Sequence, residues 1–290
     1  MIKFGKFHDK YYKLLLLVPI AILLFSLVYL FVFNAQNDSF IYKDVSLTGG
    51  TSVTIYGDWD KLQAGEFLKD KLDDVSIKQI YNFSTGDQVA LIIETKSDME
   101  ISKINIEEFM GEELKEGVNS NMEFTGSSLS ESFYKQLLIA VFIAFVFMAL
   151  VVFLLFRTMI PSLAVILSAI TDIIMTLMVV NLLGIKMSTA GIVAFLMLIG
   201  YSVDTDILLT NRILKRGEGT INDRIYGAFK TGITMTLTSL TAIVVAFIII
   251  KPFSGVLTQI FTILIIGLSF DILNTWITNV SIIKWYANKK

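Results

Sequence analysis

The chain has no cysteine and only one histidine, His8, among its 290 residues. The absence of cysteine excludes disulfide bonds, thiolate metal sites and cysteine nucleophiles. A single histidine beside a basic N-terminal stretch is typical of a surface residue and not of a metal ligand. No GxxxxGK[ST] phosphate-binding loop is present, which argues against ATP hydrolysis by this chain. We therefore predict no catalytic residue, no metal site and no cofactor, and we expect no nucleic-acid partner.

Apolar residues dominate the composition of the chain. They make up 54% of the chain, whereas about 45 to 50% is usual for a soluble domain. The mean hydropathy is +0.68. This composition indicates an integral membrane protein. The 24 basic and 26 acidic residues nearly balance, but they are strongly segregated along the chain.

Six apolar runs are long enough to cross a bilayer, since about 20 residues suffice for a helix. We predict spans at 14–33, 137–156, 163–183, 189–209, 233–250 and 256–283. The first run is too long for a signal-peptide core and is followed by no cleavage site, so we expect it to be retained. The predicted organisation is a lead at 1–13, a first span at 14–33, a separate domain at 34–135, helices 2 to 6 at 136–283 and a tail at 284–290.

Residues 34–135 carry 19 Asp and Glu against 9 Lys and contain no spanning run. Strand-like alternation occurs around Val53 and Ile55 and again at Val89, Leu91 and Ile93. Two segments with apolar residues at helical spacing lie between predicted strands. The resulting β-α-β, β-α-β order predicts an α+β ferredoxin-like domain.

Loop charges predict the orientation. With six spans, 13 basic and 3 acidic residues of the loops and termini fall on one side. By the positive-inside rule that side is the cytoplasm. Both termini are then cytoplasmic, and residues 34–135 are extracytoplasmic in the cell membrane.

Four acids and one arginine within or at the ends of the spans are the candidate functional residues: Asp172, Asp204, Asp206, Asp271 and Arg212. A carboxylate at the bilayer centre costs about 2.5 to 3.5 kcal/mol, so such residues are functional candidates by default. Asp204 and Arg212 share one helix face, whereas Asp206 lies about 200° round from Asp204. Depths counted along the helices suggest that Asp172, Asp204 and Asp271 could meet in one buried layer able to hold and release protons. The alternative is that these acids bond hydroxyls and amides of adjacent helices and only fix packing.

Several motifs in the same order resemble the SecD/SecF protein-export family, most closely its archaeal SecF-type members. They are IGYSVDTDILLTNRILKR, which includes Gly200 and Tyr201, LTGGT with Gly49, Gly50 and Thr51, SAITDIIMTLMV with Asp172, and GLSFDILNTWITNVSIIKWY. The acid of the bacterial fourth-span motif aligns with Thr205, and Asp204 and Asp206 flank it. From the residues alone, we expect Gly49 and Gly50 to supply a turn or an unusual φ.

This resemblance implies membership of the RND superfamily and a six-span half that pairs with SecD. It implies a complex that assists the SecYE-type translocon in export of preprotein chains across the lipid membrane, with Asp172 and Arg212 in ion coupling. Two alternatives remain open at this point. One is an RND-type exporter of lipids or small molecules, and the other is a subunit that stabilises the translocon without ion flux.

Overall fold

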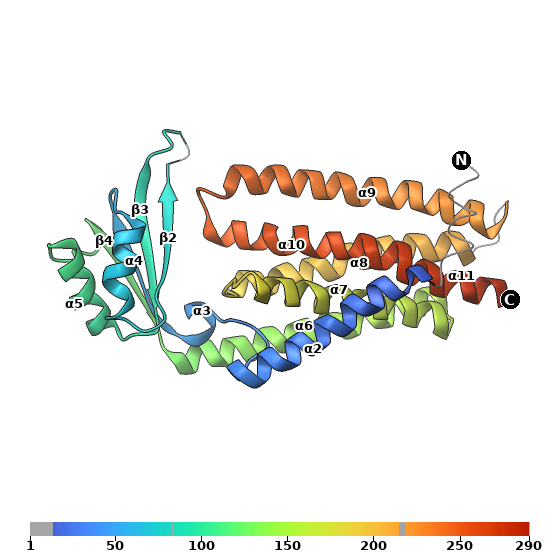
Figure 1. Cartoon of the computed structure of the whole chain (residues 1–290), viewed down its shortest axis with the longest axis horizontal. Coiled ribbons are helices and arrows are strands. Elements are labelled where there is room, and N and C mark those ends of the chain that lie inside the picture. Colours follow the sequence, from blue (N-terminus) through green and yellow to red (C-terminus); the bar gives the residue numbers. More distant parts are fainter. Residues whose placement is uncertain (1–13, 83, 215–218, 290) are drawn as a thin grey trace.

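The computed structural model describes residues 14–82, 84–214 and 219–289. A small α+β domain caps one end of an elongated bundle of helices, and the C-terminal helix lies at the opposite end (Figure 1). The basic lead at 1–13, which includes His8, and the basic residues Lys215, Arg216 and Lys290 lie outside the described residues.

The bundle contains the long helices. They are α2 (Leu17–Asn37), α6 (Ser127–Phe156), α7 (Met159–Leu182), α8 (Thr189–Leu214), α9 (Ile221–Ile250), α10 (Gly255–Leu273) and α11 (Val280–Lys289), with a π-helical turn η1 (Asn274–Asn279) between the last two. Taking α10, η1 and α11 as one continuous helix, six helices of the described chain are long and apolar enough to cross a membrane. The predicted number of spans is therefore confirmed.

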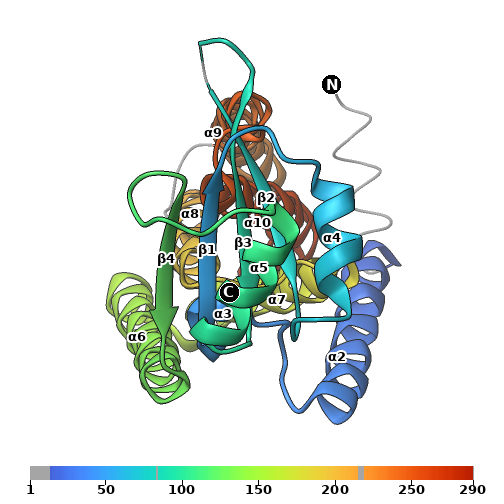
Figure 2. The ribbon, with the colours of Figure 1, turned by 90° about the vertical axis from the view of Figure 1, so that its left-hand side faces the viewer.

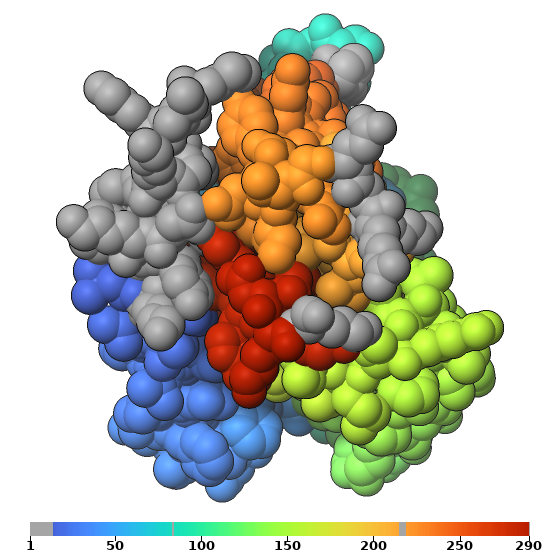
Figure 3. Space-filling model, turned by 90° about the vertical axis from the view of Figure 1, so that its right-hand side faces the viewer, coloured from blue at the N-terminus to red at the C-terminus, as the bar shows by residue number. Residues whose placement is uncertain are grey.

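Burial divides the bundle into a centre and a periphery. Helices α7 and α8 are the most buried, and α10 packs against α7, α8 and α9. Helices α6 and α9 turn most of their apolar side chains outward, as helices facing lipid do. Seen from the end away from the domain, the C-terminal residues lie between α2, α6 and α9 (Figure 3).

Two helices extend furthest beyond their predicted apolar runs. Helix α6 starts at Ser127 and not at 137, and its first turns carry the Glu131–Lys135 ion pair. Helix α9 starts at Ile221 and not at 233, because the Thr220 and Asp223 side chains form a capping box at its N-terminus. Hydropathy locates the apolar part of a helix, whereas the hydrogen-bonded helix continues into the polar region.

The α+β domain consists of α3 (Val45–Thr48), β1 (Gly50–Tyr56), α4 (Lys61–Lys69), β2 (Ser76–Tyr81), β3 (Gln88–Thr95), α5 (Met99–Met110) and β4 (Ser120–Thr125). Its four strands form an antiparallel sheet in the order β2-β3-β1-β4. Helices α4 and α5 cover the face of the sheet that points away from the bundle (Figures 1 and 2). Fully buried Val53, Ile55, Leu91 and Ile93 pack there against Ile106 of α5. The predicted alternation therefore marks the inner face of the sheet at these four strand positions, whereas Val89, also part of the predicted pattern, is exposed.

Gly49 and Gly50 connect α3 to β1 with φ values of 82° and 139°. A Cβ at Gly50 would lie 2.2 Å from the carbonyl oxygen of Thr95, and one at Gly49 would lie 2.6 Å from the backbone of Ser127. Only glycine tolerates both this backbone conformation and this close approach. The predicted unusual φ is observed, and it allows α3, β1 and the start of α6 to meet. Thr51 follows, with a buried hydroxyl that donates to the carbonyl of Ser97 at 2.8 Å.

Candidate functional site

Three carboxylates from three helices lie at the centre of the bundle. Asp172 of α7, Asp206 of α8 and Asp271 of α10 each have no exposed surface. We refer to these three residues as the carboxylate layer. Because none of the three side chains is exposed, the polar contacts within the layer act in a medium of low dielectric constant.

Asp172 is held by two neighbours. Its Oδ2 accepts a hydrogen bond from the Ser202 hydroxyl of α8 at 2.6 Å, and its Oδ1 accepts one from the Asn274 amide of η1 at 2.6 Å. Both oxygens of this carboxyl group are therefore occupied, and Asp172 joins α7 to the two helices that carry the other acids.

Asp206 has one occupied oxygen and one free oxygen. Its Oδ1 accepts from the Thr275 hydroxyl at 2.8 Å and from the Asn279 amide at 2.6 Å. Its Oδ2 is buried and accepts no hydrogen bond of good geometry within the described residues, although the Ser168 hydroxyl of α7 interacts with this carboxyl group. A buried oxygen without a hydrogen-bond partner is energetically costly.

Thr275 links Asp206 to Asp271. Its single hydroxyl lies 2.8 Å from Asp206 Oδ1 and 3.1 Å from Asp271 Oδ1. One hydroxyl proton can serve only one of these oxygens at a time, although the hydroxyl oxygen can also accept. A proton on either carboxyl group would therefore complete the chain of hydrogen bonds through Thr275.

The π-helical turn η1 places the amide donors. Asn274 and Asn279 are five positions apart, so in a regular α-helix their side chains would point about 140° away from each other. In the structure each donates to a different acid of the layer, Asn274 to Asp172 and Asn279 to Asp206. A π-turn inside an α-helix is frequent at functional sites. The sequence suggested hydroxyl and amide partners on adjacent helices in general, but it gave no signal for the π-turn that positions Asn274 and Asn279.

No basic side chain in the described part of the chain neutralises the charge of the layer. None of the ion pairs formed by the described residues involves Asp172, Asp206 or Asp271. Three negative charges without a cation would repel one another and each would lack hydration. Simultaneous ionisation of all three carboxyl groups is therefore unfavourable. No group of three or more His, Cys, Asp or Glu side chains within the described ranges has the geometry of a metal site.

Asp204 does not belong to the layer, so the prediction that Asp172, Asp204 and Asp271 meet is wrong. Asp204 is exposed on the outer face of α8, together with Gly200 and Tyr201. The turn of about 200° between positions 204 and 206 puts one acid inside the bundle and the other outside it. The sequence alone does not show which of the two acids faces the interior of the bundle, because this depends on which face of α8 packs against α7 and α10.

Arg212 also lies apart from the layer. It is exposed in the last turn of α8, where a cation interacts favourably with the helix dipole. A Cβ added to Gly227 of α9 would lie 3.2 Å from an Arg212 guanidinium nitrogen, so this side chain rests against α9. Arg212 forms no ion pair with Asp204 or with the layer in the described part of the chain.

Comparisons with known proteins give one consistent result. Residues 106–289 match the family model for the C-terminal part of the protein export membrane proteins SecD/SecF. The chain is 40% identical over 284 residues to the protein-export membrane protein SecF of Methanocaldococcus jannaschii, with 97% of each chain covered. It is 40% identical over 283 residues to SecF of Methanothermobacter thermautotrophicus, with 96% of this chain and 93% of the relative covered.

The fold also matches solved structures. SecDF of Thermus thermophilus, described as a translocon-associated membrane protein, superimposes with a TM-score of 0.73 at 20% identity and covers 96% of this chain. This chain spans 38% of the length of that SecDF chain. A second SecDF structure, in a super-membrane-facing form, gives a TM-score of 0.57 at 18% identity and covers 94% of this chain. The chain is thus a multi-pass membrane protein of protein export, and it belongs to the SecD/SecF family.

Proposed function

We propose that this chain forms the SecF-type half of a SecD/SecF unit, and that movement of protons or another small cation through the carboxylate layer supports export by the SecYE-type translocon. One observation carries the proposal: three fully buried carboxylates from three helices lie together without a basic partner among residues 14–82, 84–214 and 219–289. Such a layer can change its charge only by binding or releasing a cation. Packing alone would not require three acids at the centre of the membrane, because hydroxyl and amide groups suffice to join helices.

The outer face of α8 is the surface we assign to SecD. Val193, Met197, Gly200, Tyr201 and Asp204 follow one another at helical spacing and are all exposed. Leaving a carboxylate such as Asp204 in contact with lipid would cost about 2.5 to 3.5 kcal/mol. A second set of helices over this stripe would remove that cost. The greater length of the matched SecDF chain supports a second half as the occupant.

The orientation and the domain class complete the proposal. The excess of Lys and Arg in the loops and termini at one end supports cytoplasmic termini. The acidic domain is then extracytoplasmic, where it would contact the emerging preprotein or SecD. The strand order β2-β3-β1-β4, with both helices on one face, supports the ferredoxin-like class.

The test compares Asp172→Asn with Asp87→Asn in cells that depend on this chain for export of a reporter. Asp87 is an exposed acid in the turn between β2 and β3, so its variant controls for the chemical change itself. We expect Asp172→Asn to lose support of export while SecD still copurifies, and Asp87→Asn to export normally. Normal export by Asp172→Asn would reject ion coupling and leave a structural role. Arg212→Met tests separately whether that arginine takes part.

A further inference from the structure

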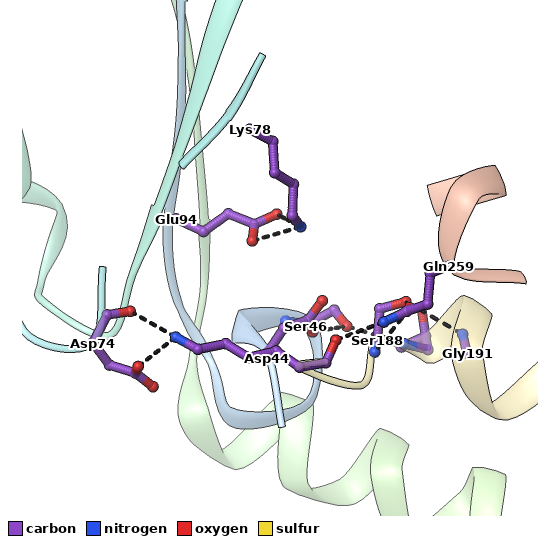
Figure 4. Close-up of polar contacts among 10 residues, drawn as sticks. Asp44, Ser46, Asp74, Lys78, Glu94, Ser188, Gly191 and Gln259 are labelled. Carbon is purple, nitrogen blue, oxygen red and sulfur yellow. Dashed lines mark hydrogen bonds and ion pairs between the residues drawn. The ribbon is translucent and has the colours of Figure 1, made fainter. Parts of the chain in front are cut away.

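The connection between α7 and α8 touches both the extracytoplasmic domain and the membrane helices. We call residues 186–189 the joint segment. On the domain side, the Lys186 ammonium donates to the Asp74 carboxylate and to the Asp74 backbone carbonyl. The Thr189 N–H donates to the Ser46 hydroxyl at 3.1 Å. Figure 4 shows Asp74, Asp44 and Ser46 of the domain on one side of this segment and Gln259 of α10 on the other.

Backbone pairing strengthens the same attachment. The Asp44 N–H donates to the Met187 carbonyl at 3.0 Å, and the Met187 N–H donates to the Tyr42 carbonyl at 2.6 Å. These bonds form a short parallel bridge between the strand-like residues before α3 and the joint segment. The segment that leads into the domain is therefore paired with the segment that leads into α8.

Gln259 connects the joint segment to α10. Its amide nitrogen donates to the Lys186 carbonyl at 2.5 Å, and its amide oxygen accepts from both the hydroxyl and the N–H of Ser188. Gly191 makes room for this contact, since a Cβ there would lie 3.0 Å from the Gln259 amide oxygen and 2.3 Å from the Met187 sulfur. Gln259 of α10 thus forms hydrogen bonds with two residues, Lys186 and Ser188, just before the start of α8.

Apolar packing and an ion pair both stabilise the contacts of the joint segment. Ile41, Leu47 and Met187 are buried in one apolar cluster with Ile192 of α8 and Leu264 of α10. Burial alone would raise the pKa of Asp74, but the neighbouring Lys186 and Lys96 ammonium groups lower it below its ordinary value. Asp74 is therefore ionised at neutral pH, and its ion pair with Lys186 is present.

We infer that the joint segment is a rigid coupling element that transmits movement of the extracytoplasmic domain to α8 and α10, with Lys186 and Gln259 as its positioning residues. These two helices carry Asp206 and Asp271, whose contacts with Thr275 depend on how α8 and α10 lie against each other. The inference rests on the proposed function, because it assigns the path by which the domain and the carboxylate layer would act together.

The absence of cysteine allows a direct test. The double variant Asp74→Cys/Lys186→Cys removes the ion pair and places the only two thiols of the chain on either side of the joint. Export is measured in cells carrying the complete complex, before and after treatment with a bifunctional maleimide crosslinker, with a monofunctional maleimide as control. We expect the unlinked variant to support export less well than the parent, because it loses one of several contacts of the joint, and the crosslink to restore export in the same molecules. This rescue excludes misfolding as the cause of the loss.

Adding Gln259→Leu to the cysteine pair distinguishes transmission of domain movement to α10 from simple positioning of the domain. We expect the crosslink to fail to restore export in this triple variant, because the connection to α10 is missing. Three results would overturn the inference: full export by the unlinked pair, no recovery on crosslinking, or recovery in the triple variant. Asp206→Asn in the crosslinked background tests the proposed function separately. Normal export there would reject ion coupling without affecting the crosslinking result.

Discussion

Replacing Asp206 by asparagine and by alanine distinguishes an ion-carrying acid from one that only fixes packing. Asp206 Oδ1 accepts from Thr275 at 2.8 Å and from Asn279 at 2.6 Å. Asparagine retains this oxygen and nearly the same shape, so both hydrogen bonds can persist. Alanine removes the acceptor and leaves the buried Asn279 amide without this partner, whereas the Thr275 hydroxyl can still donate to Asp271. The two variants therefore differ in whether they keep the hydrogen bonds that hold the helices together, whereas neither can bind and release a proton at this position.

The expected changes in the free energy of unfolding follow from these hydrogen bonds. A hydrogen bond between membrane helices contributes on average about 0.6 kcal/mol and at most about 1.7 kcal/mol. The loss of the Asn279 bond in Asp206→Ala, with Thr275 still bonded to Asp271, then destabilises the folded protein by about 1 to 2 kcal/mol. Asp206→Asn should change the free energy of unfolding by less than about 1 kcal/mol, because no bond is lost. If the acid carries ions, both variants lose support of export despite this difference in stability.

The assay combines reporter export in cells with unfolding of the purified proteins in detergent. Thr210→Val is the matched control. Thr210 lies one turn beyond Asp206 on the buried face of α8, and its hydroxyl has no partner among the described residues. We expect this control to export normally and to be as stable as the parent. Wild-type export by Asp206→Asn, together with loss of export by Asp206→Ala, would refute the reasoning and assign Asp206 to packing.

Two further predictions concern packing and pH. Gly267→Ala should destabilise the bundle by about 1 to 3 kcal/mol in an unfolding measurement, because its Cβ would lie 2.4 Å from the buried Leu198 side chain. Gly200→Ala has no atom within 4 Å of the new Cβ, and an equal loss of stability in both variants would contradict this explanation. Burial raises the pKa of Asp44, although hydrogen bonds from Ser46 oppose the shift. Ionisation of Asp44 is thus less favourable in the folded state, and the wild type loses stability as pH rises from the unfolded-state pKa, about 3.9, through the raised folded value. Asp44→Asn keeps the acceptor for Ser46 without this loss, so its melting temperature relative to wild type should rise with pH across this range, and a constant difference would contradict the assignment.

Much of the architecture was predictable because it depends on local patterns. Apolar runs gave the six spans, and alternation gave the inner face of the sheet at Val53, Ile55, Leu91 and Ile93. The pair Gly49–Gly50 gave a backbone conformation that other residues avoid. These features are encoded within a few consecutive residues, so the sequence alone reveals them.

The arrangement of the site was not predictable in the same way. Which of Asp204 and Asp206 faces inward depends on how α8 packs against α7 and α10, and both acids lie in an apolar run. The π-turn at 274–279 changes the direction of Asn279 but leaves no signal in hydropathy. The joint segment pairs residues far apart in the sequence, such as Asp74 with Lys186. Only the three-dimensional packing brings these groups together.

The central claim is that the carboxylate layer moves charge across the membrane. Its most direct test is the electrical current through proteoliposomes that contain this chain and SecD, recorded under an applied membrane potential for the wild type and for Asp271→Asn. Asp271 is fully buried and keeps one oxygen free of hydrogen bonds within the described residues. We predict a current in the wild type and none in Asp271→Asn at equal protein content, and equal currents in the two would contradict the claim.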